Sequence, residues 1–171
     1  GLRKENAVSA GNAGCKGICD RVPFDRPDAL PQPALCQGGE CFDELLLHGL
    51  SDYLAQQPGD ALIVLHQLGS HGPAYYKRVP AAFKRFQPEC ARVDVKECSR
   101  EAIVNSYDNT ILYTDHVLAE TIRLLQAEQS RFDAAMLYIS DHGESLGESG
   151  IYLHGFPYRI APREQTAVPL I

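Results

Sequence analysis

Two stretches of the chain carry apolar residues at helical spacing. The first runs from about Glu40 to Gln57, where Pro58-Gly59 would end a helix. Its apolar positions are Phe42, Leu45, Leu46, Leu50, Tyr53 and Leu54. The second begins at about Ser99, a residue type favoured at helix N-caps, and runs to Gln129. Its expected inner face consists of Ile103, Tyr107, Ile111, Thr114, Leu118, Ile122 and Leu125. The pattern predicts two helices, each packed on a core through one face.

Two continuous apolar runs, Ala61 to Leu65 and Ala134 to Ile139, have the length and composition of strands buried on both faces. A strand, a helical crossover and a second strand form a βαβ unit, so we expect the two strands to be parallel and joined right-handed. Glycine and proline are frequent in residues 1–39 and 66–98, which therefore predict long loops. The fold class expected from this order is α/β.

Both ends of the chain suggest a fragment. The 171 residues suit one domain or a large piece of one. The sequence starts at Gly1 without an initiator Met or a signal-peptide pattern, and it stops at Ile171 inside an apolar run. We therefore expect residues 1–171 to be part of one domain that is truncated at both ends.

Charge argues against one class of function, and hydropathy argues against a membrane-spanning segment within the chain. The chain has 16 basic and 22 acidic residues, a net charge of −6, which argues against a nucleic-acid binder because phosphate recognition uses clustered Lys and Arg. No apolar stretch approaches the roughly 20 residues that span a bilayer, so no transmembrane helix is expected within the chain.

The six cysteines form three close pairs along the sequence: Cys15 with Cys19, Cys36 with Cys41, and Cys90 with Cys98. Six cysteines allow 15 pairings, and the sequence alone does not choose among them. The clustering favours three short-range disulfides, each contributing roughly 2 kcal/mol. The alternative is a four-cysteine zinc site made by the first two pairs, although their spacings are looser than the usual C-x2-C. Because disulfides persist outside the cytosol, an extracytoplasmic domain is expected.

Ionisable residues follow both predicted strands, at the edge where open parallel sheets bind ligands. His66 and His71 follow the first strand, while Asp141, His142 and Glu144 follow the second. A third segment carries His154 after a glycine-rich loop, Gly147 to Gly150, that could fold back over the others. Asp and His are ligands that zinc or manganese accepts. We therefore expect a metal site that includes Asp141 and His142, with His71 and His154 nearby.

Each of these residues also has a structural interpretation. Asp141 could cap a helix after the strand, and His142 could be a core histidine with satisfied hydrogen bonds. Glu144 could hold a ligand in place or cap a helix. His66 is expected to pack rather than to bind metal. Lys16, between two cysteines that would fix its loop, could contact an anion or simply be solvated.

The segment from residue 140 to 155 reads SDHGESLGESGIYLHG and closely resembles a motif of bacterial phosphoethanolamine transferases. These are metal-dependent enzymes of the alkaline phosphatase and sulfatase superfamily. HQLGSHGPAYYKR, residues 66–78, resembles their second motif, and CKGICDRVP, residues 15–23, resembles a third. The form GSHGP, with Gly after His71, is most similar to the lipid A-modifying branch, which includes the colistin-resistance enzymes.

The resemblance implies an alkaline phosphatase/sulfatase-like fold, with a mixed, mainly parallel sheet flanked by helices. It implies that Asp141 and His142 are ligands of a catalytic zinc. His71 and His154 would line the phosphoethanolamine site, binding phosphate or a second zinc. Glu144 matches an acidic position beside the metal, and Lys16 matches a basic position that contacts the phosphoryl group. The cysteine pairs match periplasmic disulfides of the family.

The activity implied is transfer of phosphoethanolamine from phosphatidylethanolamine to a lipid A phosphate through a phospho-Thr intermediate, which gives resistance to polymyxin. The family's Thr nucleophile and an upstream metal-binding Glu match no residue here, so no catalytic residue is expected within the chain. The resemblance also implies a monomer anchored in the bacterial inner membrane by upstream helices, with its catalytic domain in the periplasm.

Three other functions remain open. A sulfatase or phosphodiesterase could use a related metal site on a soluble ester. A phosphoethanolamine transferase could act on a lipopolysaccharide core sugar instead of lipid A. A disulfide-stabilised periplasmic domain could bind a ligand without turnover.

Overall fold

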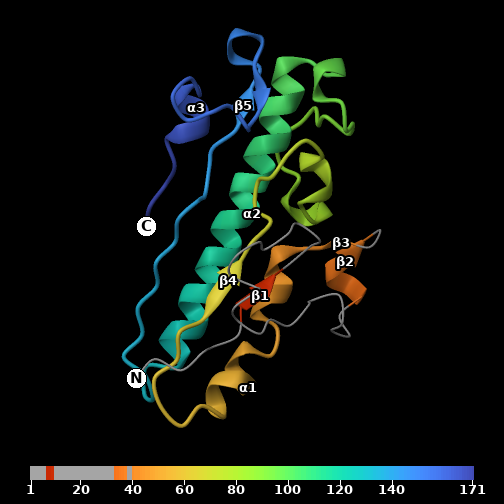
Figure 1. The fold of residues 1–171 in the computed structure, drawn as a ribbon. Coiled ribbons are helices and arrows are strands. Elements are labelled where there is room, and N and C mark those ends of the chain that lie inside the picture. Colours follow the sequence, from red (N-terminus) through yellow and green to blue (C-terminus); the bar gives the residue numbers. More distant parts are fainter. Residues whose placement is uncertain (1–6, 10–32, 38–39) are drawn as a thin grey trace. The chain divides into compact units, whose positions relative to one another are not determined.

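The structure is a computed structural model that describes residues 7–9, 33–37 and 40–171 (Figure 1). The chain divides into two compact units. The first unit comprises Gly1–Gly69 and Thr114–Ala134, and the second comprises Ser70–Tyr113 and Ala135–Ile171. Within the described residues, no helix combines the length and the hydropathy needed to cross a bilayer.

The first unit contains short strands and helices. Strand β1 (Ala7–Ser9) pairs in parallel with β4 (Val64–His66), and β2 (Cys36–Gln37) pairs antiparallel with β3 (Glu40–Cys41). A 3-10 turn, η2 (Pro33–Leu35), precedes β2. The buried carboxylate of Asp43 accepts hydrogen bonds from the N–H groups of Leu68 and Gly69, at 2.8 and 2.7 Å. This contact fixes the loop that leaves β4.

The helix expected from Glu40 to Gln57 is interrupted. The 3-10 helix η3 (Asp43–Leu47) and the α-helix α1 (Leu50–Ala55) are separated at Gly49, whose φ of 73° is a left-handed conformation that glycine adopts readily. The apolar positions were nevertheless correctly identified, apart from the half-buried Tyr53: the buried ones are Phe42, Leu45, Leu46, Leu50 and Leu54. The hydrophobic pattern thus located the buried face but not the break.

The prediction of two buried parallel strands is wrong for the described residues. In the first run, only Val64 to His66 is a strand, and Leu62 and Val64 are 56% and 39% exposed. His66 is exposed as well, rather than packed. In the second run, Ile139 forms only an isolated antiparallel bridge with Leu170.

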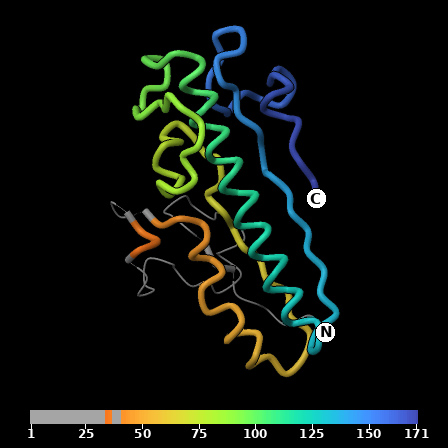
Figure 2. Tube along the Cα trace, turned by 180° about the vertical axis from the view of Figure 1, so that it is seen from behind, coloured from red at the N-terminus to blue at the C-terminus, as the bar shows by residue number. Residues whose placement is uncertain are grey.

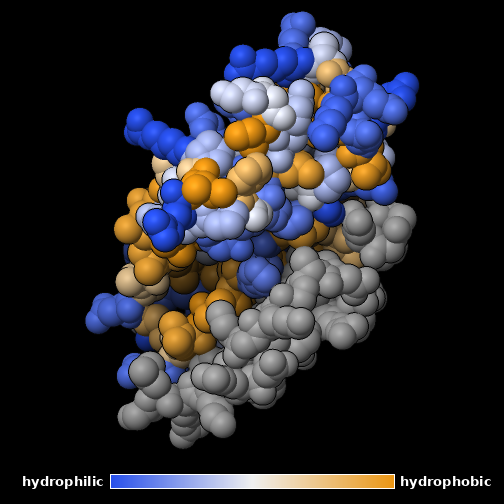
Figure 3. All heavy atoms as spheres, turned by 45° about the horizontal axis from the view of Figure 1, so that its top comes forward, coloured by the Kyte–Doolittle hydropathy of each residue, from blue (hydrophilic) through white to orange (hydrophobic). Residues whose placement is uncertain are grey.

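Apolar content gave these runs their strand-like pattern, but burial depends on neighbouring elements, which the pattern does not specify. Figure 3 shows apolar side chains exposed between hydrophilic ones on one face of the molecule. Large exposed apolar residues include Leu62, Leu137, Ile139, Tyr158 and Ile160.

The long helix α2 (Arg100–Ala127) confirms the second helical prediction. The Ser99 hydroxyl oxygen accepts a hydrogen bond from the N–H of Ala102, at 3.2 Å, as expected of an N-cap. The buried face is rotated from the predicted one, since Ile111 and Ile122 are 48% and 42% exposed. Buried positions on α2 include Ile103, Ser106, Asn109, Thr110, Tyr113, Thr114, Val117 and Thr121.

Polar side chains on the first half of α2 are buried because they hold the preceding loop. Asn109 pairs with both backbone groups of Phe86, and the Ser106 hydroxyl accepts a hydrogen bond from the N–H of Cys90. The Thr110 hydroxyl lies 2.7 Å from that of Ser70. The loop therefore runs alongside this part of α2, as Figures 1 and 2 show.

The loop predicted for residues 66–98 is confirmed after His66, the last residue of β4, and it includes three 3-10 turns: η4 (Tyr75–Lys77), η5 (Ala81–Phe83) and η6 (Val95–Glu97). The second unit continues with β5 (Ser145–Leu146), η7 (Glu148–Gly150), β6 (Tyr152–Leu153) and α3 (Arg163–Thr166). Its core consists of Tyr75, Cys90, Val95, Ala102 and Ile103, with Leu146, Tyr152 and Leu153 packed against them. This core fixes the hairpin of β5 and β6 to the loop and to α2.

Candidate metal and phosphate site

Three histidines of the second unit lie together. One potential ligand atom from each of His71, His142 and His154 lies within 4.8 Å of the other two. The rings of His142 and His154 stack with centroids 3.8 Å apart, and the ring of His71 lies edge-on to His154 at 4.9 Å. We call these residues the histidine trio. They come from the loop before η4, the segment before β5 and the position directly after β6.

The β5–β6 hairpin returns His154 to His142. The two strands pair antiparallel, with Ser145 opposite Leu153. Gly147 and Gly150 form the turn with φ values of 109° and 75°, which glycine adopts without the steric cost that a Cβ brings. The expectation that this glycine-rich loop folds back is confirmed. Leu153 itself has a φ of 62°, a strained conformation for a residue with a Cβ, and it redirects the chain immediately before His154.

Glu144 is the buried centre of the hydrogen bonds behind the trio. Only 7% of the residue is exposed. Its Oε1 accepts from Nδ1 of His154 at 2.7 Å and from the N–H of Gly72 at 3.3 Å. Its Oε2 accepts from the Tyr75 hydroxyl at 3.0 Å. These three hydrogen bonds compensate the cost of burying the carboxylate. Glu144 thus orients His154, and it does not cap a helix, which was the other interpretation.

All three histidines direct Nδ1 toward an acceptor. Nδ1 of His71 lies 2.6 Å from the carbonyl oxygen of Gly72, and Nδ1 of His142 lies 3.0 Å from that of Gly143. Because a carbonyl or an ionised carboxylate only accepts, Nδ1 carries the proton in each neutral ring. The lone pair is then on Nε2, the arrangement in which histidines bind zinc. The donor set therefore fits a metal such as zinc, and His142 is half-buried at this site rather than a core residue.

Asp141 lies beside the trio and is largely exposed. Its side chain is 82% exposed, and its Oδ1 lies 3.8 Å from Nε2 of His142. The same oxygen accepts a hydrogen bond from the N–H of His142, at 3.0 Å. No helix begins at Asp141, so the helix-cap interpretation is wrong. Its assignment as a metal ligand stays a prediction.

Two phenols, of the buried Tyr75 and the half-buried Tyr107, lie near enough to the Glu144 carboxylate for its charge to affect their pKa values. Burial raises the pKa of Tyr75 well above its ordinary value, and the nearby charge of Glu144 raises it further. Burial and Glu144 also raise the pKa of Tyr107, whose ring lies edge-on to Tyr75 with centroids 5.6 Å apart. Tyr75 therefore remains protonated near neutral pH and keeps donating to Glu144.

Two residues that support the site, Tyr75 and Gln165, are not predicted from the sequence. Tyr75 lies within the motif of residues 66–78, so a signal was present. Gln165, in α3, is buried. Its side-chain amide donates to the hydroxyl of Ser145, at 3.0 Å, and its backbone carbonyl oxygen accepts from the N–H of Gly143. A Cβ on Gly143 would collide with the carbonyl oxygen of Glu164. The segment bearing His142 therefore packs directly on α3, a contact for which the sequence gives no signal.

Two of the three expected disulfides, Cys36–Cys41 and Cys90–Cys98, lie in the part of the chain that the structure describes, and both are formed. The four-cysteine zinc site is therefore wrong, since Cys36 and Cys41 are bonded to each other. Cys15, Cys19 and Lys16 lie outside the described residues.

Comparison with known proteins identifies related sequences and folds. The family model described as sulfatase matches residues 4–171. Phosphoethanolamine transferase EptA of Salmonella typhimurium is 51% identical over 160 residues, which is 94% of this chain and 29% of that protein. Phosphatidylethanolamine transferase Mcr-1 of Escherichia coli is 44% identical over 165 residues, which is 92% of this chain and 30% of that protein.

Among solved structures, the soluble domain of lipooligosaccharide phosphoethanolamine transferase A from Neisseria meningitidis matches with a TM-score of 0.89 and 42% identity. The match covers 97% of this chain and 49% of that one. The chain thus has the α/β, alkaline phosphatase/sulfatase-like fold expected from the resemblance. It spans less than a third of the length of the curated relatives it matches.

Proposed function

Because the chain belongs to the sulfatase family, we propose that it is part of a zinc-dependent phosphoethanolamine transferase, with residues 1–171 forming part of its periplasmic catalytic domain. The observation that carries the proposal is the histidine trio, in which each Nδ1 faces an acceptor and each Nε2 is left for a metal or a phosphoryl oxygen. The relatives named phosphoethanolamine transferases support the group transferred.

The donor in this proposal is phosphatidylethanolamine, and the acceptor is a phosphate of lipid A. The donor is supported by the name of the relative Mcr-1, a phosphatidylethanolamine transferase. The acceptor is supported by the GSHGP sequence around His71, which is most similar to the lipid A-modifying branch. Adding an aminoethyl group lowers the negative charge of the lipid, so polymyxin and other cationic peptides bind it less tightly.

In this proposal, some residues of the chain bind the metal and others contact the substrate. Asp141 and His142 would hold the catalytic zinc, and His71 and His154 would face the phosphoethanolamine group or hold a second zinc. Glu144 orients His154 for either task, and Lys16 would contact the phosphoryl oxygens. Zinc bound there would act as a Lewis acid that lowers the pKa of a Thr hydroxyl supplied by the protein outside this chain.

The reaction then has two steps. The Thr oxygen attacks the phosphorus of phosphatidylethanolamine and releases diacylglycerol, and the phosphoethanolamine group then passes from Thr to a lipid A phosphate. Positive charge beside the phosphorus stabilises the equatorial oxygens in both transition states. In this proposal, His71, His154 and Lys16 would supply that charge or hold the metal that does.

We place the protein in the bacterial inner membrane as a monomer, held by helices upstream of these residues, with this domain in the periplasm. Two observations support the compartment. The disulfides Cys36–Cys41 and Cys90–Cys98 require an oxidising environment. A Neisseria meningitidis relative is described as an integral membrane protein.

The test is His142→Ala in the full-length protein, with His48→Ala as the matched control because His48 is exposed and lies outside the trio. We expect His142→Ala to abolish the lipid A mass shift and to lower zinc content, with an unchanged circular dichroism spectrum. Full transfer by this variant would refute the zinc assignment. Hydrolysis of a soluble sulfate or phosphate ester without a lipid A mass shift would identify a hydrolase instead.

A further inference from the structure

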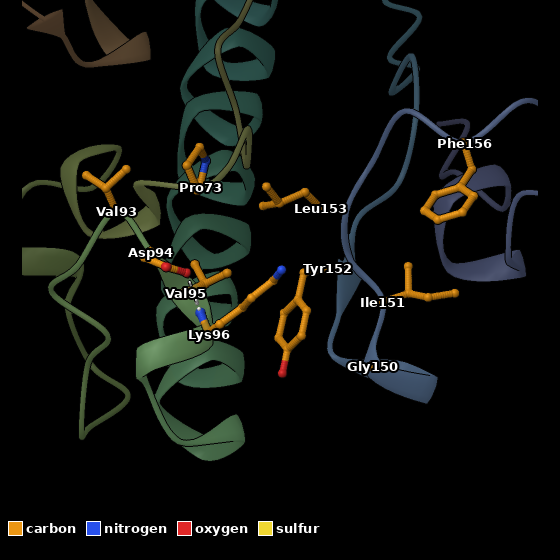
Figure 4. Close-up of a pocket in the computed structure, with 10 residues that line it drawn as sticks. All are labelled: Pro73, Val93, Asp94, Val95, Lys96, Gly150, Ile151, Tyr152, Leu153 and Phe156. Carbon is orange, nitrogen blue, oxygen red and sulfur yellow. Dashed lines mark hydrogen bonds between the residues drawn. The ribbon is translucent and has the colours of Figure 1, made fainter.

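A groove of about 510 Å³ lies in the second unit (Figure 4). The loop closed by the Cys90–Cys98 disulfide forms one wall, and the end of the β5–β6 hairpin forms the other. The lining residues are Pro73, Val93, Asp94, Val95, Lys96, Gly150, Ile151, Tyr152, Leu153 and Phe156. The volume is within the range of small-molecule sites, about 300–1,000 Å³.

The lining is mostly apolar, and part of it is held in place by the core of the second unit. Val95 belongs to the core of the second unit, and Tyr152 and Leu153 pack against that core. At the rim, Val93 and Phe156 remain 56% and 45% exposed. Apolar lining that is partly exposed favours an occupant with a hydrocarbon portion, since binding such an occupant removes the exposed apolar surface from water.

One cation lies in this apolar lining. Figure 4 shows the Lys96 side chain extending across the groove toward the side of Tyr152. The hydrogen bond between Asp94 and Lys96 does not involve the Lys96 ammonium group. Oδ1 of Asp94 accepts from the backbone N–H of Lys96, at 3.1 Å. Within the described residues, Lys96 forms no ion pair. Two nearby carboxylates have other partners, since Glu89 pairs with Lys84 and Glu97 pairs with Arg92.

The surrounding segment is basic, in contrast to the rest of the chain. Between residues 77 and 100 the basic residues are Lys77, Arg78, Lys84, Arg85, Arg92, Lys96 and Arg100. The acidic residues there are Glu89, Asp94 and Glu97. The whole chain has a net charge of −6, so this segment concentrates positive charge. The charge is complementary to an anion, and the groove to a hydrocarbon chain.

We propose that this groove binds an anionic glycerophospholipid of the bilayer, with one acyl chain along the apolar lining and the lipid phosphate on Lys96. Leu153 lines the groove and His154 is the next residue, so a lipid bound here holds the membrane surface beside the histidine trio. This site is separate from the donor and acceptor of the proposed transfer, and lipid binding requires no turnover.

The experiment measures sedimentation of residues 1–171, without the upstream helices proposed above, with vesicles of phosphatidylcholine that either contain or lack phosphatidylglycerol. Val93→Asp places a charge on the exposed rim, and Lys96→Gln removes the cation. Leu137→Asp and Lys77→Gln are matched controls: Leu137 is 76% exposed, Lys77 lies in the same basic segment, and neither lines the groove. All four positions are exposed, so the variants are expected to fold.

We expect binding only to vesicles that contain phosphatidylglycerol. Lys96→Gln should weaken it about fivefold, the usual contribution of one lysine near an anionic surface. Val93→Asp should weaken it about tenfold, because an apolar contact is lost and a negative charge added. The controls should stay within about twofold of the unsubstituted protein.

Three results would overturn the inference: no binding to either vesicle, equal binding to both, or equal losses from Lys77→Gln and Lys96→Gln. The last would show that the charge acts diffusely, without a groove. Methyl NMR shifts of Val93 and Ile151 add a direct readout. They should move with dihexanoyl phosphatidylglycerol and not with glycerol phosphate, and equal shifts with both would exclude acyl-chain binding. Neither measurement depends on transfer activity, so the proposed function can fail without affecting this result.

Discussion

The Glu144 carboxylate lies 2.7 Å from Nδ1 of His154, ten residues further along the chain. The hairpin between them fixes this distance, and the donors Gly72 and Tyr75 fix the carboxylate. The pair sets the ring of His154 so that its Nε2 is left for a ligand. Glu144 is therefore a positioning residue that acts through His154.

Glu144→Gln should weaken zinc binding by about 10- to 100-fold while leaving the fold intact. The glutamine amide has only one acceptor oxygen, whereas Gly72, Tyr75 and His154 all donate to the carboxylate. Its NH2 group would face one or more of these donors, so His154 loses its fixed orientation. Competition titration with a zinc chelator measures the affinity, and ¹⁵N NMR reports the His154 tautomer. Glu164→Gln, at an exposed glutamate, serves as the control. Unchanged affinity and tautomer in Glu144→Gln would show that Glu144 does not position the ring.

Gly143→Ala should destabilise the protein by about 1–3 kcal/mol, because the added Cβ meets the backbone carbonyl of Glu164 and the backbone must shift. Gly59→Ala is the matched control, since a Cβ there meets no atom within 4 Å. Thermal unfolding measures both variants. Equal melting temperatures for the two variants would mean that α3 can shift without loss of stability and does not hold the segment of His142 in place.

Reduction should lower the melting temperature without releasing metal. Each short-range disulfide contributes roughly 2 kcal/mol, so opening Cys90–Cys98 and Cys36–Cys41 shifts unfolding by several degrees. Calorimetry with and without a phosphine reductant gives the shift, and a zinc-sensitive dye gives the metal released. The double variant Cys90→Ser/Cys98→Ser isolates one bridge. Zinc released in step with reduction would instead mean that cysteines bind the metal.

Glu148 should contribute stability that disappears in acid. Burial alone would raise the pKa of its carboxyl group, but hydrogen bonds from its own N–H and that of Leu146, and then the Arg100 guanidinium, hold the pKa below its usual value. A lowered folded-state pKa gives stability that is present above the unfolded pKa and is lost as pH falls through the folded one.

Glu148→Gln should therefore be less stable than the unsubstituted protein near pH 7, by up to about 1 kcal/mol for this partly exposed pair. The difference should vanish as the pH falls through the folded-state pKa. Urea unfolding at a series of pH values measures it. A difference that stays constant with pH would show that shape, and not charge, accounts for the effect.

Local signals in the sequence predicted the site better than they predicted the sheet. Gly147 and Gly150 correctly predicted the turn that folds the chain back. The histidines at 71, 142 and 154 lie together, as expected. Ser99 marked the start of α2 correctly. Each of these features depends on short-range geometry or on residue types with few structural uses, which a sequence displays directly.

What the sequence did not reveal depends on tertiary partners. Leu62 and Ile139 look like residues of buried strands, yet burial requires neighbours that an apolar run does not specify. Ser106 and Asn109 look like exposed helix positions, yet they are buried because they bind the backbone of the preceding loop. Hydropathy alone places such residues on the wrong face, since it ignores hydrogen bonds to distant segments.

The β5–β6 hairpin also has a consequence for the order in which the site assembles during folding. Glu144 and His154 meet across a loop so short that its closure costs little entropy, and hairpins form within about 1–10 μs. His71 must close a far longer loop to reach them, a contact of high contact order that forms late. We therefore expect the hairpin half of the site to form first, and His71 to join it only when the second unit reaches its native topology.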